Sequence, residues 1–596
     1  MPRSPIVWGA GLSIVLGSLP SLILPPAFAA SLPWILEQTL PPDSVPEFLR
    51  LFLELPTAVR TILALGILTS ARQIIQRYQR RLDRKSLGPD VVEVPRVRLK
   101  WPLNLDFIPL DVNVMKNEYC GTTWEILSGE YGNLWNLGLF GQDQIMTMEP
   151  EAVKSILSTD FNSYEKGPDV HGKMFSVLGN GIFNSDGEVW KFHRSMSRPY
   201  FTRDRISHFD NFARHSDVAI SKLLSRMTEP NRPAVDFQDL VSRFTLDSGT
   251  EFLFGRDAHS LDAPLPYPHE EPRDDTASFS AAFSRAQGHV MHRFGLAMFW
   301  PWMELFWDRT SEDMKIINAY VTPILRKKLE QRATKDIESK PTNEGDLENG
   351  DTLLDHLINF TQDESVIRDE IINILVAARD TTATTLTFAV YILAENPGIM
   401  KRLRDEIIGR LGTSNLPTPD DFKELKYLRA VLNETLRLFP AVPVNLRTAA
   451  KSTVLKVNGK QYYVPAGASM TWSTLMMQRR KDLWGTDADE FDPDRWLDDR
   501  LKKYVTPNPF IFLPFNAGPR ICVGQQFAYN EASFFLCRLL QRVESIELAP
   551  EAHPAGTLPR PEWKNGTGRR VYEKVWPKNH LTLHCNGGLW LRVKEA

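Results

Sequence analysis

One cysteine near the C-terminal end has the surroundings of a metal-ligating thiolate. Cys522 lies in the ten-residue stretch FNAGPRICVG (residues 515–524), and a helical pattern begins at Gln525. Glycines allow tight turns that aim backbone N–H groups at a sulfur, and a helix N-terminus stabilises a thiolate. The alternative is a buried structural cysteine ahead of a helix, which is common for an isolated cysteine. The spacing of phenylalanine, glycines, arginine and cysteine favours the ligand.

The other three cysteines offer no second ligand of this kind. Cys120, Cys537 and Cys585 share no ligand spacing with Cys522 or with each other. Zinc would need Cys-x-x-Cys or paired histidines, and the sparse cysteines argue against a disulfide framework. The pattern therefore points to a lone thiolate of the sort that holds heme iron.

The stretch resembles the cysteine-ligand signature of the cytochrome P-450 family, the heme-thiolate monooxygenases. Three further segments match the family in the same order, so that the resemblance spans about residues 90–596. It implies that Cys522 ligates the iron of heme b (iron protoporphyrin IX). It also implies that Arg520 neutralises a heme propionate and that Phe515 packs against the proximal heme face.

The first of these segments is a Glu-x-x-Arg pair on a predicted helix. Glu434 and Arg437 are i,i+3 neighbours, and Arg495 follows downstream in FDPDRW (residues 491–496). Taken alone, such a pair is usually a solvated surface ion pair. The resemblance implies instead that Glu434, Arg437 and Arg495 form a structural lock that braces the heme pocket and performs no chemistry.

The second segment lies inside a long apolar helix predicted from about Val366 to Ala394. It reads AARDTT (residues 377–382) and looks like the family's oxygen-activation motif. The resemblance implies that Thr381 holds the oxygen site and that Asp380 is the acid beside it, so that both relay protons. Many members have glycine where this chain has Ala378. The alternative is a polar kink or a surface face of the helix.

The third segment is WKFHR (residues 190–194). Its spacing places Trp190 and Arg194 on one helix face, and by resemblance both bind a heme propionate. Ordinary packing is the alternative for this spacing alone. Arg447 is a further expected propionate contact, whereas His193 is interpreted as packing or surface.

The bulk properties favour one large domain behind an N-terminal anchor. The chain has 596 residues, and its net charge of −3 argues against nucleic acid as a partner. We expect a mainly α protein of the cytochrome P-450 fold with small β-sheets near 130–150, 440–475 and 575–596. The predicted division is an anchor and basic linker over 1–88 and a heme-thiolate catalytic domain over 89–596. Residues 550–578 are expected to form a surface excursion.

The N-terminus predicts attachment to a membrane. Residues 6–30 are almost entirely apolar and long enough to cross a bilayer, although a cleaved signal peptide is the rival reading. A shorter apolar stretch, 61–69, is either an interfacial helix or the weaker arm of a hairpin. A cluster of basic residues over 72–85 follows and should stay cytosolic. We therefore expect an endoplasmic reticulum membrane protein with its catalytic domain facing the cytosol.

These features predict an enzyme that hydroxylates lipophilic molecules with O2. Parts of the sequence resemble fungal members that act on alkanes and fatty acids, and aromatic hydrocarbons are a further option. The aromatic run 294–307 is helix core, a membrane-facing lid or a direct substrate contact. No dinucleotide or flavin motif is evident, so the resemblance implies an NADPH–cytochrome P-450 reductase as electron donor. The alternatives are an isomerase, a peroxygenase or a heme-binding sensor.

Overall fold

A computed structural model describes residues 55–201, 209–270, 279–338 and 352–596, with a few isolated positions before residue 55. The chain forms two compact units. One comprises Met1–Val92 with His292–Ser311, and the other comprises Glu93–Met291 with Glu312–Ala596. The larger unit carries every candidate site residue, whereas the predicted division into 1–88 and 89–596 stays a prediction.

Helices make up most of the larger unit, as the sequence predicts. The longer helices of the described residues are α4 (Phe107–Asn117), α5 (Thr122–Tyr131), α7 (Gly167–Leu178), α8 (Gly187–Ser197), α9 (Asp210–Thr228), α10 (Phe237–Phe254), α11 (Phe279–Gly295), α13 (Ser311–Glu338), α14 (Leu353–Phe360), α15 (Glu364–Glu395), α16 (Pro397–Leu411), α18 (Lys426–Leu438) and α21 (Gln525–Arg542). Shorter ones are α6 (Pro150–Lys154), α12 (Trp300–Met303), α17 (Asp421–Glu424), α19 (Thr474–Met477) and α20 (Lys481–Trp484).

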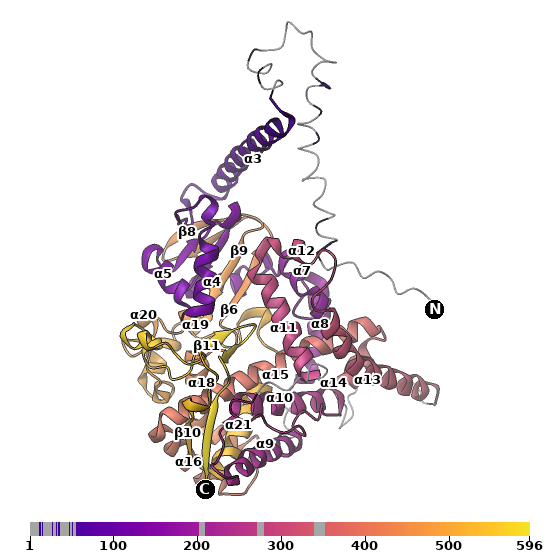
Figure 1. The fold of residues 1–596 in the computed structure, drawn as a ribbon, viewed down its shortest axis with the longest axis vertical. Coiled ribbons are helices and arrows are strands. Elements are labelled where there is room, and N and C mark those ends of the chain that lie inside the picture. The colour runs from indigo at the N-terminus through magenta and orange to yellow at the C-terminus, as the bar shows by residue number, and fades with distance from the viewer. Residues whose placement is uncertain are drawn as a thin grey trace. The chain divides into compact units, whose positions relative to one another are not determined.

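Helix α15 is the central element of this unit. It packs against α10, α18 and α21 (Figure 1). The carboxylate of Asp363 caps it by accepting the backbone N–H groups of Ser365 and Val366. Its second half is almost wholly buried, which explains why a helix so apolar in sequence is stable there. The predicted helix Val366–Ala394 is confirmed.

Small sheets occupy the three predicted regions and also include strands outside them, at 91–93, 164–165, 235–236 and 543–548. The largest has the order β2 (Leu134–Asn136), β3 (Gln144–Thr147), β9 (Ser469–Ser473), β6 (Val444–Ala449) and β4 (Tyr164–Glu165). Strands β7 (Thr453–Val457) and β8 (Lys460–Val464) form a hairpin. Strands β10 (Val543–Leu548), β13 (Trp590–Glu595) and β5 (Val235–Asp236) form another sheet, and β11 (Pro577–Asn579) pairs with β12 (Leu583–Cys585). Strand β1 spans Val91–Glu93.

The smaller unit contains one long helix, α3 (Thr57–Leu87). This single helix includes both the apolar stretch 61–69 and the basic residues that follow. The segment 296–307 of the same unit exposes several aromatic side chains, among them Trp302, Phe306 and Trp307. The predicted span 6–30 lies almost entirely outside the described residues. Within the described part of the chain, no helix combines the length and the apolar character that a membrane crossing requires.

Candidate functional site

The loop that carries Cys522 is built around two backbone constraints. The N–H of Cys522 donates to the carbonyl oxygen of Phe515 at 3.0 Å, which closes the loop on itself. Gly518 has a φ of +66°, and a Cβ atom there would collide with the carbonyl oxygen of Leu157. Only glycine therefore fits at this position. Helix α21 begins three residues after the cysteine, as predicted.

The protein alone does not favour the thiolate of Cys522. Burial raises the pKa of its thiol, and this outweighs the N–H of Gly524 and the charge of Arg194, which both lower the pKa. The expected help from the helix N-terminus is present but too weak. A further positive charge beside the sulfur, such as a metal ion, would lower this pKa and favour the thiolate.

A cavity of about 670 Å³ opens at this cysteine. Its wall combines Cys522 with Trp190 and Arg194 of α8, and with Arg198 and Phe201 beyond that helix. The guanidinium of Arg194 lies 5.8 Å from the ring centroid of Trp190, so the two side chains share one face as the spacing predicts. Cys522 is accessible through this opening, although the surrounding protein atoms are dense enough for desolvation to raise the pKa of its thiol. The cysteine loop and the third sequence segment, residues 190–194, thus meet at one cavity.

Beside this cavity the structure gathers cations in excess of carboxylates. Strands β4 and β6 are antiparallel and pair Glu165 with Thr448. The next two residues in this register, Lys166 and Arg447, are therefore brought close to each other. Arg520 joins them, and its guanidinium reaches the ring of Trp190 at 4.5 Å. We call Lys166, Arg447 and Arg520 the cation cluster.

Two carboxylates of the described residues, Asp186 and Glu165, act on the cation cluster, and only Asp186 forms an ion pair with it. Asp186 pairs with Arg520 at 2.7 Å. Burial, followed by the charges of Arg447 and Arg520, holds the pKa of Lys166 well below its usual value. Burial and the charge of Arg520 lower the pKa of Arg447 to about 9.

Lowered pKa values of this kind show that the buried positive charge is incompletely balanced. The Nε of Arg520 is also buried without a hydrogen-bond partner in the described structure. The arrangement fits a ligand with two carboxylates, which is what the propionates of heme provide. The residues present thus fit heme at the Cys522 cavity.

The predicted lock is assembled as one buried network. Glu434 and Arg437 form two hydrogen bonds of 2.8 Å, and the Nε of Arg495 lies 3.5 Å from Glu434. All three side chains are completely buried. The indole of Trp496 and the N–H of Asp492 also donate to Glu434. Although burial raises the pKa of Glu434, the charges of the two arginines outweigh it and lower the pKa.

Carbonyl oxygens and one further carboxylate of the chain accept the remaining N–H donors of the two lock arginines. Arg437 donates to the carbonyl oxygens of Gln478, Ala488 and Glu490. Arg495 pairs with Asp487 at 2.9 Å. Every charge of the lock therefore has a partner within the protein.

Asp380 and Thr381 lie in the middle of α15, away from the lining of the Cys522 cavity. The hydroxyl of Thr381 donates to the carbonyl oxygen of Ala377 at 2.7 Å, one turn earlier. Asp380 lies 3.5 Å from the guanidinium of Arg379. Arg379 itself is buried and donates to the hydroxyls of two serines on α11.

Several candidate site residues were not predicted from the sequence. Lys166 and Asp186 join the cation cluster only through the pairing of β4 with β6 and the loop before α8. His193, interpreted as packing or surface, is buried and lies 2.8 Å from Glu370 of α15. This pair ties the helix of Trp190 and Arg194 to the central helix.

A buried acid on α21 was also missed. Glu531 accepts a hydrogen bond from Ser248 of α10 at 2.7 Å, and Thr382 of α15 bonds to it as well. Burial raises its pKa to about 8. Glu531 thus joins the helix that follows Cys522 to the helix that carries Thr381.

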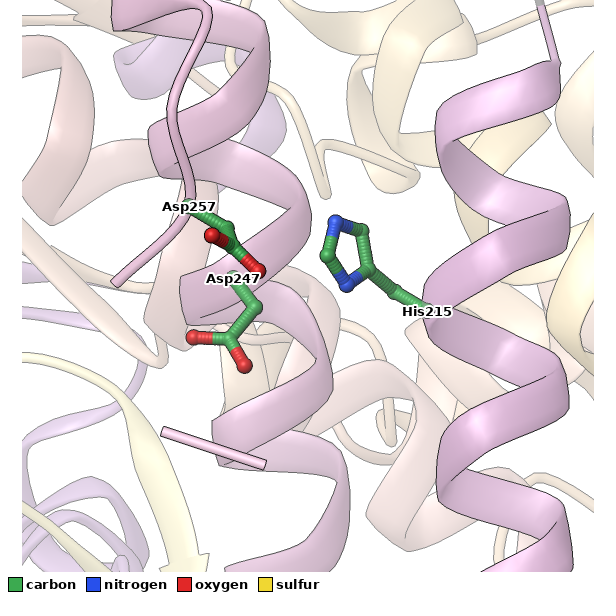
Figure 2. A group of neighbouring side chains, drawn as sticks. All are labelled: His215, Asp247 and Asp257. Carbon is green, nitrogen blue, oxygen red and sulfur yellow. The ribbon is translucent and has the colours of Figure 1, made fainter. Parts of the chain in front are cut away.

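A second group of possible metal ligands lies apart from the cysteine. Figure 2 shows His215 of α9 facing Asp247 of α10 and Asp257 of the following segment, with ligand atoms within 4.8 Å of one another. Asp247 already accepts from Ser260 and Leu261. His215 already contacts Glu251 at 2.7 Å. These bonds fasten the 255–261 segment to α10, and the group is a structural one.

Comparisons with known proteins agree with this geometry. The family model described as Cytochrome P450 matches residues 109–560. Cytochrome P450 52A3-A of Candida maltosa is 36% identical over 465 residues, which are 76% of this chain and 81% of that protein. Cytochrome P450 52A10 of the same yeast is 40% identical over 428 residues, or 69% of this chain and 78% of that protein. Cytochrome P450 monooxygenase pvhE of Talaromyces variabilis is 34% identical over 477 residues, or 76% and 84%.

The fold and the cysteine cavity define a heme-thiolate protein. The chain belongs to the cytochrome P450 family. It is a cytochrome P450 monooxygenase, and its cofactor is heme with a thiolate ligand.

Proposed function

We propose that this monooxygenase hydroxylates lipophilic substrates, namely fatty acids, alkanes or aromatic hydrocarbons, with O2 and electrons from an NADPH-dependent reductase. The observation that carries the proposal is that Cys522 lines a cavity whose neighbouring loop and strands hold a buried excess of positive charge. A sulfur ligand and a cationic border are what a heme with two propionates requires.

In this proposal, Cys522 is the iron ligand. Arg520, Arg447, Lys166, Trp190 and Arg194 hold the propionates. Phe515 borders the proximal side, and its ring lies 5.1 Å from that of Tyr529. When bound, heme supplies the site at which O2 is reduced, and its thiolate ligand favours cleavage of the O–O bond.

Asp380 and Thr381 are the proton-transfer residues of this proposal. The hydroxyl of Thr381 donates a hydrogen bond to the carbonyl oxygen of Ala377, which fixes its direction on α15. The hydroxyl oxygen can still accept a hydrogen bond from a proton donor. The carboxyl of Asp380 retains partial access to solvent, with 18% of its side chain exposed. It can therefore exchange protons with water and pass them towards Thr381.

The substrate class rests on the sequence resemblance and on the apolar surface of the smaller unit. Phe306 and Trp307 are 74% and 61% exposed, which is unusual for such large apolar side chains. A surface of this kind suits contact with a bilayer, from which a lipophilic substrate would arrive. We place the protein at the endoplasmic reticulum membrane, with the 6–30 segment as its anchor and the catalytic domain in the cytosol.

The reduced, carbon-monoxide-bound spectrum of the purified protein tests the iron ligand. The thiolate-shifted Soret band is expected, and Cys522→Ala should abolish it. A protein with imidazole coordination would contradict the assignment. Incorporation of label from labelled O2, together with reductase-dependent NADPH consumption, separates a monooxygenase from an isomerase or a peroxygenase.

A substrate-binding difference spectrum tests the substrate class. Fatty acids, alkanes and aromatic hydrocarbons of increasing size should displace the water ligand of ferric heme, with affinity that rises with apolar area. If no lipophilic compound displaces that ligand, the proposed substrate class is wrong, and the result favours a heme-binding sensor.

A further inference from the structure

A second cavity, of about 690 Å³, lies outside the site already described. Helices α17, α18 and α21 and the short helix η9 (Pro493–Trp496) contribute to its wall. Three of its lining residues are cations, namely Lys423, Lys426 and Arg429, and none is acidic. A cavity lined by charges of one sign attracts an ion of the other sign.

Tyr529 positions the guanidinium of Arg429 at this cavity. The central carbon of its guanidinium lies 3.6 Å from the ring centroid of Tyr529, and the two side chains also share a hydrogen bond. The hydroxyl of Tyr529 donates to the oxygen of Asn433, which also lines the cavity. The Nη1 of Arg429 is buried and has no hydrogen-bond partner among the described residues. A fixed guanidinium with an unused donor loses little entropy when it binds an oxyanion.

The charge balance favours a divalent anion over a single carboxylate. Lys423 is already matched by Asp420, at 2.6 Å. No carboxylate pairs with Lys426 or Arg429 within the described part of the chain. Two positive charges thus remain, and a phosphate monoester carries about −1.5 to −2 at neutral pH. The amides of Gln526 and Asn433 add neutral polar groups to the same wall.

The cavity also borders the lock. Trp496 lines it, and the indole N–H of Trp496 donates to Glu434 at 3.0 Å. A ligand that packs against Trp496 would therefore stabilise the hydrogen bond between its indole and Glu434 of the lock.

We infer that this cavity binds the phosphate group of a small molecule through Arg429 and Lys426. The inference is independent of the proposed substrate, because it rests on a different cavity and different residues.

Thermal unfolding of the heme-loaded full chain tests the site. Inorganic phosphate and adenosine monophosphate are titrated against chloride and glutamate at equal ionic strength and pH. Either phosphate compound should raise the midpoint saturably, since a ligand that binds only the native state stabilises it by mass action. Arg429→Gln with Lys426→Gln should weaken the apparent affinity about 10-fold or more. The matched control is Lys401→Gln with Lys456→Gln, two exposed lysines outside the cavity, which should bind as the unmodified protein does.

The two phosphate probes separate the possible sources. Equal affinities support a site for the phosphate group alone, and tighter binding of adenosine monophosphate supports a phosphorylated organic molecule. The inference is overturned if chloride gives the same shift as phosphate, or if the Arg429 and Lys426 variant responds as the control does. It is also overturned if a glutamate-rich peptide binds and neither phosphate compound does, because the cavity would then serve an acidic protein partner.

Discussion

Two groups of buried cations in the larger unit differ in how their charge is balanced. In the lock, Arg437 and Arg495 share the carboxylate of Glu434, and carbonyl oxygens and Asp487 take the remaining donors. In the cation cluster, Lys166 and Arg447 have no ion pair with any described carboxylate, and Arg520 has Asp186 alone. The lock is complete within the polypeptide, whereas the cation cluster is complete only with an anionic ligand.

This difference separates architecture from binding. A buried charge that is fully paired within the chain braces the fold, and removing one partner leaves the other uncompensated. A buried cation that lacks a partner destabilises the folded state, and binding of an anion removes that penalty. Substitution should therefore have opposite effects in the two groups, and the experiments below test that contrast.

The largest effect is expected for Glu434→Gln. The amide keeps the size of the side chain but leaves two buried arginines without their shared charge. The heme-loaded protein should lose about 3–5 kcal/mol of unfolding free energy, measured by urea denaturation. Glu490→Gln is the control, because only the backbone of Glu490 contacts Arg437 and its side chain is exposed. A loss below about 1 kcal/mol would show that the arginines are satisfied without the carboxylate.

Glu531 extends the contrast to a buried acid that forms no ion pair with any cation in the described ranges. Its pKa is about 8 in the folded protein, against an ordinary value of 4.5. Between these values the native state binds more protons than the unfolded state, so its stability falls as pH rises through that range. Glu531→Gln should remove this slope and gain on the order of a few kcal/mol relative to the unmodified protein above pH 8.

The measurement for Glu531 is the unfolding free energy from pH 5 to pH 9. Glu544→Gln is the control, since that carboxylate is solvent-exposed and pairs with Lys594. It removes one carboxyl group without removing a buried one. An unchanged slope in Glu531→Gln would mean that Glu531 is ionised in the native state at neutral pH.

A smaller and oppositely directed effect is expected in the cation cluster. Lys166→Met removes one cation that has no described ion pair. The heme-free protein should keep or gain stability, while release of heme to apomyoglobin should become about 10-fold faster or more. Lys173→Met is the matched control, because this buried lysine pairs with Asp169 at 2.6 Å.

The control should lose less stability than the lock variant, because Asp169, the partner of Lys173, is 66% exposed and stays solvated. Lys173→Met should lower stability and leave the rate of heme release unchanged. If Lys166→Met destabilises the heme-free protein as much as Lys173→Met does, the cation cluster is structural and the contrast with the lock fails.

The sequence predicts the lock better than it predicts the cation cluster, for a physical reason. Glu434 and Arg437 are one helical turn apart, so their pairing follows from local geometry. The length and type of α15 also follow from a long apolar run. Lys166 and Arg447 meet only because two strands far apart in the chain pair in one register. No local pattern encodes that register.

The 550–578 segment shows the same limit. Its prolines and glycines predict a surface excursion, yet Trp563 and Trp576 are buried. Glu573 accepts hydrogen bonds from Tyr119 and from Tyr391 of α15. Turn residues indicate where the backbone bends, but they do not indicate which side chains the bends carry inward. The prediction of a surface excursion is therefore wrong for these side chains.

Arg379 gives the smallest expected effect and the finest test of the contrast. It is a buried arginine whose guanidinium donates to the neutral hydroxyls of Ser280 and Ser284 on α11, at 3.1 and 3.0 Å. Its nearest carboxylate is Asp380, at 3.5 Å. It is therefore less well balanced than the lock and better balanced than the cation cluster.

Replacing both serines by alanine should loosen α11 without unfolding the protein. Two neutral acceptors contribute about 1–3 kcal/mol together, but α11 can open locally and let water reach the guanidinium, which limits the global loss. Amide hydrogen exchange over α11 should therefore rise about 10-fold, with the unfolding midpoint nearly unchanged. Ser195→Ala is the control, because its exposed hydroxyl bonds only within its own helix. A large fall in the midpoint would instead place Arg379 with the lock, since only a cation that water cannot reach makes the whole fold depend on its partners.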